Sequence, residues 1–300
     1  MVPLFNPSAR LADVVARLAL QCDRVILVDD GSDDESWDSA ARLACDRVSV
    51  IGPRSNSGIA SALNVGVRLA MAGSGVDFIL TCDQDSLISE LYVAAAMHRL
   101  SSAEDPESYA LICASAYNGV PVPSRLWHRR EPLEPMQSGM LIRASTFMRI
   151  GYFSDHLFID CVDTDFYLRC RSAGLKALLA PPCPLAHHLG ASRWNAEMAD
   201  RHSRHPSWRT YYVARNRLKM MQIYGVADPE WSLRISVIQL VGMAALLVSS
   251  PDRYAQWAAM RLGYRAFRAG VNGPLSARGR RMLLSLEAAH ASPAKGSGRG

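Results

Sequence analysis

The chain has 300 residues, of which 49% are hydrophobic and 20% charged, with a formal net charge of +5. This length and composition exclude a disordered or collagen-like chain and are typical of one or two globular domains. The seven cysteines are scattered and contain no Cys-x-x-Cys pair. Their pattern argues against a disulfide framework or a cysteine zinc site and favours a reducing compartment.

The charge is distributed unevenly along the chain. The 48 residues from Arg253 to Gly300 contain nine Lys and Arg and one acid, so they carry +8 and the first 252 residues carry −3. Such a basic region favours contact with an anionic partner, such as a phospholipid surface, a lipid pyrophosphate or a nucleic acid. The N-terminus lacks the features of a signal peptide, so a cytoplasmic location is expected.

Strand-like and helix-like segments alternate over roughly the first 180 residues. Short apolar runs predict strands at 2–5, 24–28, 48–51 and 77–81, and apolar residues at helical spacing lie between them. Asn6 and Pro7 predict the start of the first helix, because Asn is a good N-cap and Pro suits the first helical position. This alternation predicts an α/β fold with a mainly parallel sheet flanked by helices.

The alternation is looser after Asp85. Strands are predicted at 111–113, 140–142 and 175–180, and a helix over 164–173. From Trp208 onward the pattern is helical. We therefore predict an α/β domain over 1–205, a C-terminal helical region over 206–290 and a disordered tail over 291–300.

Two predicted strands end in paired acids, Asp29-Asp30 and Asp83-x-Asp85. Ligands bind at the carboxyl ends of strands in open α/β sheets, and carboxylates suit a hard divalent cation such as Mn²⁺ or Mg²⁺. Helix capping explains one such turn equally well, whereas two in one sheet favour a site. The chain contains neither a GxxxxGK[ST] loop nor a GxGxxG turn after the first strand, so a metal-held diphosphate is the simplest remaining reading.

The order of the motifs resembles the family 2 inverting glycosyltransferases, which have the GT-A nucleotide-sugar-binding fold. The matching segments are Val28-Asp-Asp-Gly-Ser32, Asn56-Ser-Gly-Ile-Ala60, Asp83-Gln-Asp-Ser86, Ser138-Gly-Met140, Phe158-Ile-Asp-Cys-Val-Asp-Thr-Asp165 and His187-His-Leu-Gly190. Within the family, the chain is most similar to bacterial rhamnosyltransferases that use dTDP-L-rhamnose. This similarity lies in the Asp-Gln-Asp-Ser motif at Asp83, the Phe-Ile-Asp-x-Val-Asp motif at Phe158, and the spacing of Arg265, Gly270 and Gly273. The resemblance covers roughly residues 2–279.

This resemblance implies a role for several side chains. Asp29 would contact the nucleoside base with Asp30 beside it, Asp83 would contact the ribose, and Asp85 would ligate the cation. His187 would contact the metal or the diphosphate, with His188 as the alternative. The remaining implied nucleotide-binding residues are Asn56, Gly58 and Arg215. Helix capping explains Asn56 equally well, and an amphipathic helix that packs its aromatic residues explains the Arg215 segment equally well.

Asp163 is the expected catalytic base. An inverting transfer needs one carboxylate that takes the proton of the acceptor hydroxyl, while the cation stabilises the leaving diphosphate. A position at the start of the 164–173 helix suits an ionised carboxylate, although a plain N-cap would have the same geometry. The chain has Val162 where many family members have glutamate. Asp165 is expected to be structural or orienting.

The C-terminal region raises the question of membrane contact. Ile235–Ser250 is an uncharged run of sixteen residues, short for a spanning helix, and the next helix carries aromatic residues beside Arg261, Arg265 and Arg268. These features fit an interfacial helix on anionic lipid, and equally a helix packed on the catalytic domain.

The leading hypothesis is a cation-dependent transfer of L-rhamnose from dTDP-L-rhamnose to a glycan acceptor, lipid-linked and met at the membrane. The alternatives are another donor, such as a UDP-hexose or UDP-galactofuranose, and a non-catalytic nucleotide-sugar-binding protein. No nucleic-acid partner is expected, because no established nucleic-acid motif is present.

Overall fold

The computed structural model describes residues 1–52, 55–73, 75–181, 186–187 and 206–291. The chain divides into two compact units, Met1–Ala191 and Ser192–Gly300. The division lies earlier in the chain than the predicted 205/206 boundary. Residues 292–300 of the predicted tail lie outside the described residues.

The first sheet is parallel and has the order β1-β2-β3. Its strands are β1 (Val2–Leu4), β2 (Val25–Asp29) and β3 (Val48–Ile51). Every residue of β2 is buried, as expected for a parallel strand covered on both faces.

The second sheet is mixed and has the order β10-β6-β9-β4. Its strands are β4 (Phe78–Thr81), β6 (Tyr109–Cys113), β9 (Met140–Arg143) and β10 (Lys176–Leu179). β6 and β10 are parallel, whereas β9 is antiparallel to both of its neighbours. The α/β class is confirmed, and the predicted parallel arrangement holds for the first sheet and not for β9. No crossover helix precedes β9, because the chain reaches it through the irregular residues 122–139.

Met1 connects the two sheets. Its backbone N donates to Leu80 O (2.5 Å), and its backbone O accepts from Cys82 N (3.1 Å). This is a parallel pattern, and β1 is also parallel to β2. The carboxyl ends of β2 and β4, where the two acid pairs follow, therefore lie at the same edge.

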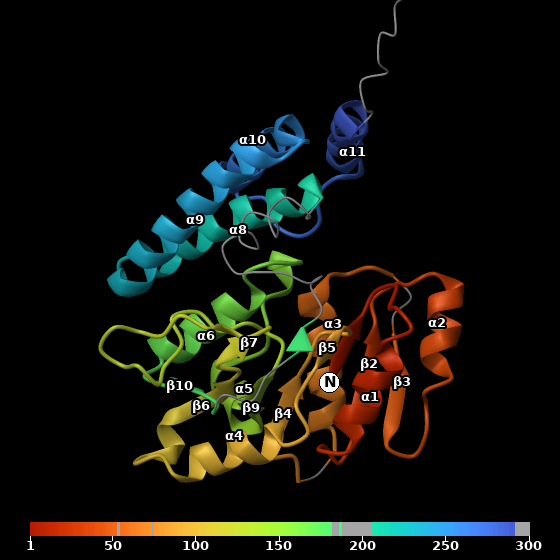
Figure 1. The fold of residues 1–300 in the computed structure, drawn as a ribbon, viewed down its shortest axis with the longest axis vertical. Coiled ribbons are helices and arrows are strands. Elements are labelled where there is room, and N and C mark those ends of the chain that lie inside the picture. The colour runs from red at the N-terminus through yellow and green to blue at the C-terminus, as the bar shows by residue number, and fades with distance from the viewer. Residues whose placement is uncertain (53–54, 74, 182–185, 188–205, 292–300) are drawn as a thin grey trace, which may run out of the picture. The chain divides into compact units, whose positions relative to one another are not determined.

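Helices surround the strands of this unit (Figure 1). They are α1 (Leu11–Ala19), α2 (Asp34–Ala41), α3 (Ile59–Met71), α4 (Tyr92–Ser101), α5 (Ala144–Ile150) and α6 (Val162–Ser172), with 3₁₀ turns η1 (Pro106–Ser108) and η2 (Asp155–Leu157). Short strands are β5 (Ser86–Leu87), β7 (Ala116–Tyr117), β8 (Val120–Pro121) and β11 (Ala186–His187). The predicted helical spacing in α1 is confirmed, because its apolar residues Leu11, Val14, Val15 and Leu18 are all buried.

The predicted helix start at Asn6 is wrong. Asn6 has a φ of 46°, and α1 begins at Leu11 without a side-chain cap. The Asn6 side chain instead accepts a hydrogen bond from Asp33 N (2.9 Å), and its backbone N donates to Ser32 Oγ (2.8 Å). Asn6 therefore braces the turn that follows β2.

The second unit consists of four described helices: α8 (Ser207–Tyr224), α9 (Pro229–Ser249), α10 (Arg253–Arg268) and α11 (Ala277–Ala291). This confirms the predicted helical pattern. α10 packs closely on α8 at Gly263, where a Cβ would lie 2.5 Å from Tyr211 O. A glycine is therefore required at this crossing.

α9 is longer than the uncharged run at 235–250 predicted. It begins at Pro229 because the Asp228 side chain caps it by accepting from Trp231 N (3.2 Å). By length and composition, Pro229–Val248 could cross a membrane, and only 22% of it is buried. No other described helix meets that criterion.

Candidate active site

The turn after β2 is built around two buried carboxylates. Asp29 is 1% exposed, and its Oδ2 accepts from Gly31 N (3.0 Å) and Ser32 N (3.1 Å). Asp29 Oδ1 is buried and has no hydrogen-bond partner within the described part of the chain. A buried acceptor without a donor is costly, so it marks a place where a ligand N–H would fit.

Asp30 has a different role, because the protein itself uses both of its carboxylate oxygens. Oδ1 accepts from Ser57 N (2.7 Å) and Oδ2 from Gly58 N (2.9 Å). Burial raises the pKa of the Asp30 carboxyl and so does the neighbouring Asp29, whereas these two N–H bonds lower it. Asp30 therefore holds the loop before α3 against the turn after β2.

Gly58 lies where two segments of the site meet. Its φ is +93°, and a Cβ would lie 2.5 Å from Phe158 O and 2.6 Å from the Phe158 ring. The chain can pass this point only without a side chain. The loop before α3 is thereby pressed against the segment that leads to Asp163.

Asn56 does not cap α3, so the alternative of plain helix capping is wrong. The N-cap position belongs to Gly58, and no side chain caps the helix. The Asn56 side chain is exposed, and its backbone N lies close to Gly31, where a Cβ would approach it to 2.6 Å. Asn56 therefore stands beside the acidic turn, on the surface.

Asp83 and Asp85 lie in the turn between β4 and β5 and are half-buried. Asp83 N donates to Ser138 Oγ (3.0 Å), which ties this turn to the segment before β9. Gln84, between the two acids, exchanges two hydrogen bonds with the backbone of Phe5 and so holds the turn beside the end of β1.

The structure brings the backbone of His187 next to the same turn. β11 pairs with β5 in antiparallel fashion, and His187 is the register partner of Ser86, the residue after Asp85. These residues are far apart in the sequence, so the pairing supports grouping them. The side chain of His187, together with His188 and Gly190, lies outside the described residues.

Asp163 is the second residue of α6. Its Oδ1 accepts from Thr164 N (2.8 Å) and its Oδ2 from Gln137 N (3.0 Å). Gln137 and Ser138 are consecutive, so one short segment contacts Asp163 on one side and Asp83 on the other. This segment is the physical link between the two acids.

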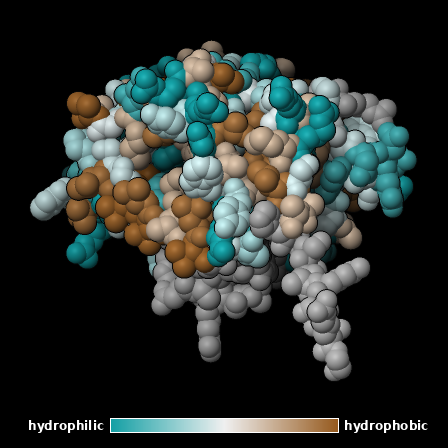
Figure 2. All heavy atoms as spheres, turned by 90° about the horizontal axis from the view of Figure 1, so that it is seen from above, coloured by the Kyte–Doolittle hydropathy of each residue, from teal (hydrophilic) through white to brown (hydrophobic). Residues whose placement is uncertain are grey.

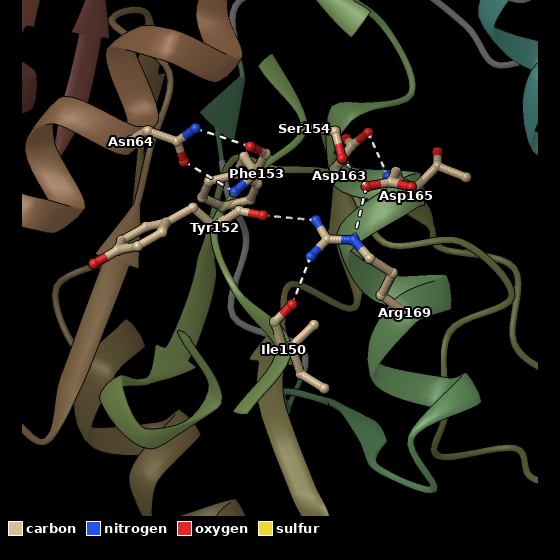
Figure 3. Close-up of polar contacts among 9 residues, drawn as sticks. Asn64, Ile150, Tyr152, Phe153, Ser154, Asp163, Asp165 and Arg169 are labelled. Atoms are coloured by element: carbon tan, nitrogen blue, oxygen red, sulfur yellow. Dashed lines mark hydrogen bonds and ion pairs between the residues drawn. The ribbon is translucent and has the colours of Figure 1, made fainter. Parts of the chain in front are cut away.

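Two side chains hold the chain that leads to Asp163 (Figure 3). Asn64 of α3 donates to Phe153 O (2.8 Å) and accepts from Phe153 N (2.9 Å). Arg169 bonds Ile150 O (3.0 Å) and Tyr152 O (2.8 Å) and forms an ion pair with Asp165 (2.9 Å). Asp165 is therefore structural, in line with the sequence prediction.

The motif order found in the sequence corresponds to a known family. Residues 1–165, more than half of the chain, match the profile described as Glycosyl transferase family 2. The chain belongs to glycosyl transferase family 2. It is 25% identical over 205 residues to the dTDP-rhamnosyl transferase RfbF of Shigella flexneri. The aligned region covers 63% of this chain and 68% of the relative.

A solved structure with a similar fold is the mannosyltransferase PcManGT of Pyrobaculum calidifontis in complex with GDP-Man and Mn²⁺. The TM-score is 0.56 at 16% identity, and the match covers 96% of this chain and 78% of that chain. At this identity the likeness concerns the fold. The protein is therefore a glycosyltransferase with a GT-A catalytic fold.

The predicted metal residues are only partly described in this glycosyltransferase. Within the described side chains, no group of three or more His, Cys, Asp and Glu could hold a metal ion. Asp85 supplies an oxygen donor of the kind that Mn²⁺ and Mg²⁺ prefer.

Arg215 lies in the other unit and is fully buried there. Its guanidinium donates to Gly273 O (2.6 Å) and Asn216 Oδ1 (2.8 Å) and lies over the rings of Tyr211 and Tyr212. Its contacts hold the segment between α10 and α11 against α8. This arrangement favours the alternative of a packed aromatic helix over contact with a diphosphate.

Two residues beside the candidate site were not predicted from the sequence. Gln137 is 7% exposed, and its Nε2 is buried without a partner in the described part of the chain. Glu134 accepts a hydrogen bond from Thr164 Oγ1, next to Asp163. Gln137 directly precedes the Ser138-Gly-Met140 motif, which was the available signal, whereas nothing in the sequence pairs Glu134 with α6.

Proposed function

We propose that this glycosyltransferase transfers L-rhamnose, with inversion, from dTDP-L-rhamnose to a lipid-linked glycan acceptor at the cytoplasmic surface of a membrane. The main support for this proposal is that the Gln137–Ser138 segment contacts Asp83 on one side and Asp163 on the other. A sugar attached to a nucleotide at Asp83 would then face the carboxylate of Asp163. The name of the Shigella relative supports the choice of donor.

Asp29 is the proposed contact for the base of the nucleotide. Its Oδ1 is a buried acceptor without a donor among the described residues, and the imide N–H of thymine or uracil would supply one. Asp30 shapes this pocket through Ser57 and Gly58, and Asn56 lines its surface. Because thymine and uracil share that N–H, Asp29 does not by itself select between dTDP and UDP donors.

Asp85 is the proposed ligand of a divalent cation, and His187, the register partner of the adjacent Ser86 across the β5–β11 pair, is the proposed second contact. The bound cation would stabilise the negative charge of the departing diphosphate. The solved mannosyltransferase of similar fold contains Mn²⁺, which supports this choice.

Asp163 is the proposed general base. As the acceptor oxygen attacks the anomeric carbon, its proton passes to a carboxylate oxygen of Asp163, and the bond to the diphosphate breaks on the opposite face. The N–H groups of Gln137 and Thr164 orient the carboxylate for this transfer.

Nucleotide binding can be tested by thermal stabilisation with dTDP, UDP and GDP, each with and without Mn²⁺. We expect dTDP with Mn²⁺ to raise Tm most, and Asp85→Asn to remove the Mn²⁺-dependent part. Larger stabilisation by UDP, with sugar release from UDP-sugars alone, would replace the rhamnose assignment with the UDP-sugar alternative.

Catalysis can be tested with Asp163→Asn. This variant should bind dTDP with Mn²⁺ normally and lose transfer by about 10² to 10⁴-fold, the usual contribution of a general base. Unchanged transfer in the variant would remove Asp163 as the base.

The proposed membrane location relies on the second unit. α9 exposes the apolar side chains Leu233, Val237, Leu240, Val241 and Val248, which share one face. α10 exposes Tyr254 and Trp257 with Arg253 and Arg261 over their rings. Apolar side chains beside aromatic and cationic ones suit the boundary between acyl chains and anionic headgroups.

A further inference from the structure

A hairpin in the catalytic unit presents an apolar and basic tip that the proposed reaction does not use. The hairpin lies in the segment between β8 and β9, which Figure 1 shows as a loop projecting near α6. Its two arms are joined around the isolated antiparallel bridge Ser124–Pro132, by Arg125 N to Glu131 O (3.0 Å) and Leu133 N to Pro123 O (2.7 Å). We name residues 126–130 the hairpin tip.

The stem of this hairpin is anchored by buried polar groups. Arg125 is 2% exposed, and its Nε donates to the Tyr167 hydroxyl of α6 (3.0 Å), which in turn donates to Pro132 O (2.6 Å). Glu131, also buried, forms an ion pair with Arg171 of α6 (2.9 Å). The stem is therefore fixed to α6 on both of its arms.

The tip itself is exposed over its whole length. Trp127 is 85% exposed and Leu126 is 61% exposed. His128, Arg129 and Arg130 are exposed as well, and the tip contains no acid. A firmly anchored stem thus holds two large apolar side chains in water, next to at least two positive charges.

We propose that the hairpin tip is a second membrane contact, in which Trp127 and Leu126 enter the headgroup boundary and Arg129 and Arg130 bind anionic headgroups. Tryptophan and leucine beside arginine are the side chains that favour this boundary. The proposal extends the membrane location of the proposed function, but it concerns a different unit of the chain from α9 and α10. A glycan is a poorer match, because a sugar site needs several convergent polar side chains around the aromatic ring.

The test measures partitioning of the full-length protein onto vesicles of phosphatidylcholine, with and without phosphatidylglycerol. Leu126→Ser/Trp127→Ser should weaken binding to both kinds of vesicle by about tenfold, through lost apolar burial. Arg129→Ser/Arg130→Ser should weaken binding by about tenfold to the anionic vesicles only. The matched control, Leu20→Ser/Met148→Ser, removes two apolar side chains of the same unit that are 79% and 77% exposed, and should bind normally.

Other outcomes separate this proposal from the proposed function. Normal vesicle binding by both tip variants, with binding lost in Val237→Ser/Val241→Ser of α9, would overturn the tip contact and leave the membrane location standing. Normal vesicle binding with loss of transfer to the glycan would instead make the tip an acceptor contact, again overturning the proposal. If the wild-type protein does not bind vesicles, the membrane location and the tip contact both fall, while dTDP stabilisation still tests the nucleotide site.

Discussion

The backbone just before Asp163 is unusually strained. Phe158, Asp160 and Cys161 all have positive φ values, of 68°, 63° and 62°, and none of them is glycine. Each such residue costs on the order of 1 kcal/mol, and such strain clusters at functional sites. The hydrogen bonds of the Asn64 and Arg169 side chains to the backbone, and the close contact of Gly58 with Phe158, hold this segment in place. The position of Asp163 is thus determined by residues that are not proposed to take part in the reaction.

Gly58→Ala tests this coupling. The new Cβ would collide with Phe158 O and displace the strained segment, so we expect a large loss of kcat together with a loss of unfolding free energy above about 1 kcal/mol. The control is Gly75→Ala, which has a similar φ of +79° and open space around the Cβ. It should lose stability without losing kcat, and equal kinetic losses in both variants would refute the coupling.

Gln137→Leu tests the unpaired amide. Gln137 Nε2 is a buried donor without a partner in the part of the chain that the structure describes, so an apolar side chain of similar size should leave the unfolding free energy unchanged or raise it. If a substrate oxygen uses that donor, kcat/KM should fall by up to about tenfold. Urea denaturation and steady-state kinetics measure the two effects, and an unchanged kcat/KM would show that the amide does not contact the substrate.

At the scale of elements, local sequence patterns predicted where the strands lie, but not the features that depend on contacts between distant parts of the chain. The short apolar runs at 48–51 and 77–81 correspond closely to β3 and β4, because a buried strand needs little besides β-branched and apolar residues. The direction of β9 could not be predicted, since it depends on the path of residues 122–139. Asn6 was misassigned because its partners, Ser32 and Asp33, are distant in the sequence.

The α6–hairpin connection predicts a pH-dependent stability. Tyr167→Phe removes the acceptor of the Arg125 Nε bond and should lower the unfolding free energy by about 1–3 kcal/mol at pH 8. Burial raises the pKa of Tyr167 to about 12, from an ordinary value of 10.0. The folded state therefore holds this proton more tightly than the unfolded state, and that stability is lost as the pH rises from 10 toward 12.

The free-energy gap between wild type and Tyr167→Phe should consequently narrow above pH 10. Urea denaturation at pH 8, 10 and 11 measures it, with Tyr109→Phe on β6, a half-buried tyrosine, as the control. A gap that stays constant up to pH 11 would mean that Tyr167 ionises equally easily in both states.

At the scale of the whole molecule, positive charge and exposed apolar side chains both occur in the C-terminal helices. The residues from Arg253 onward carry +8 and the rest carry −3. The exposed apolar residues of α9 precede this basic region directly. In Figure 2 the largest group of hydrophobic side chains lies toward the lower left of the face in view, and smaller groups lie elsewhere on it. A surface that combines apolar and basic side chains should bind anionic lipid both by burying apolar area and by electrostatic attraction.

The relative weight of these terms is measurable from salt dependence. Binding to phosphatidylglycerol vesicles should weaken between 50 mM and 500 mM NaCl, because salt screens the basic side chains, and a residual affinity should remain from α9. Val237→Ser/Val241→Ser should remove the residual binding at high salt. Vesicle binding that is independent of salt would contradict an electrostatic contribution.

The sequence by itself determined the seven longer strands of the catalytic unit, the two acid pairs that follow β2 and β4, and membership of the family through the order of its motifs. Each strand, acid pair and motif is a short stretch of sequence, so local spacing reveals it, and the order of the motifs can be read directly along the chain. Only the tertiary structure decided that Gln137 and Ser138 join Asp83 to Asp163, that Asp30 is occupied by the loop before α3, and that Arg215 is buried in the second unit. Each of these arises from hydrogen bonds or close packing between distant segments, and no local pattern encodes which distant partner a side chain will contact.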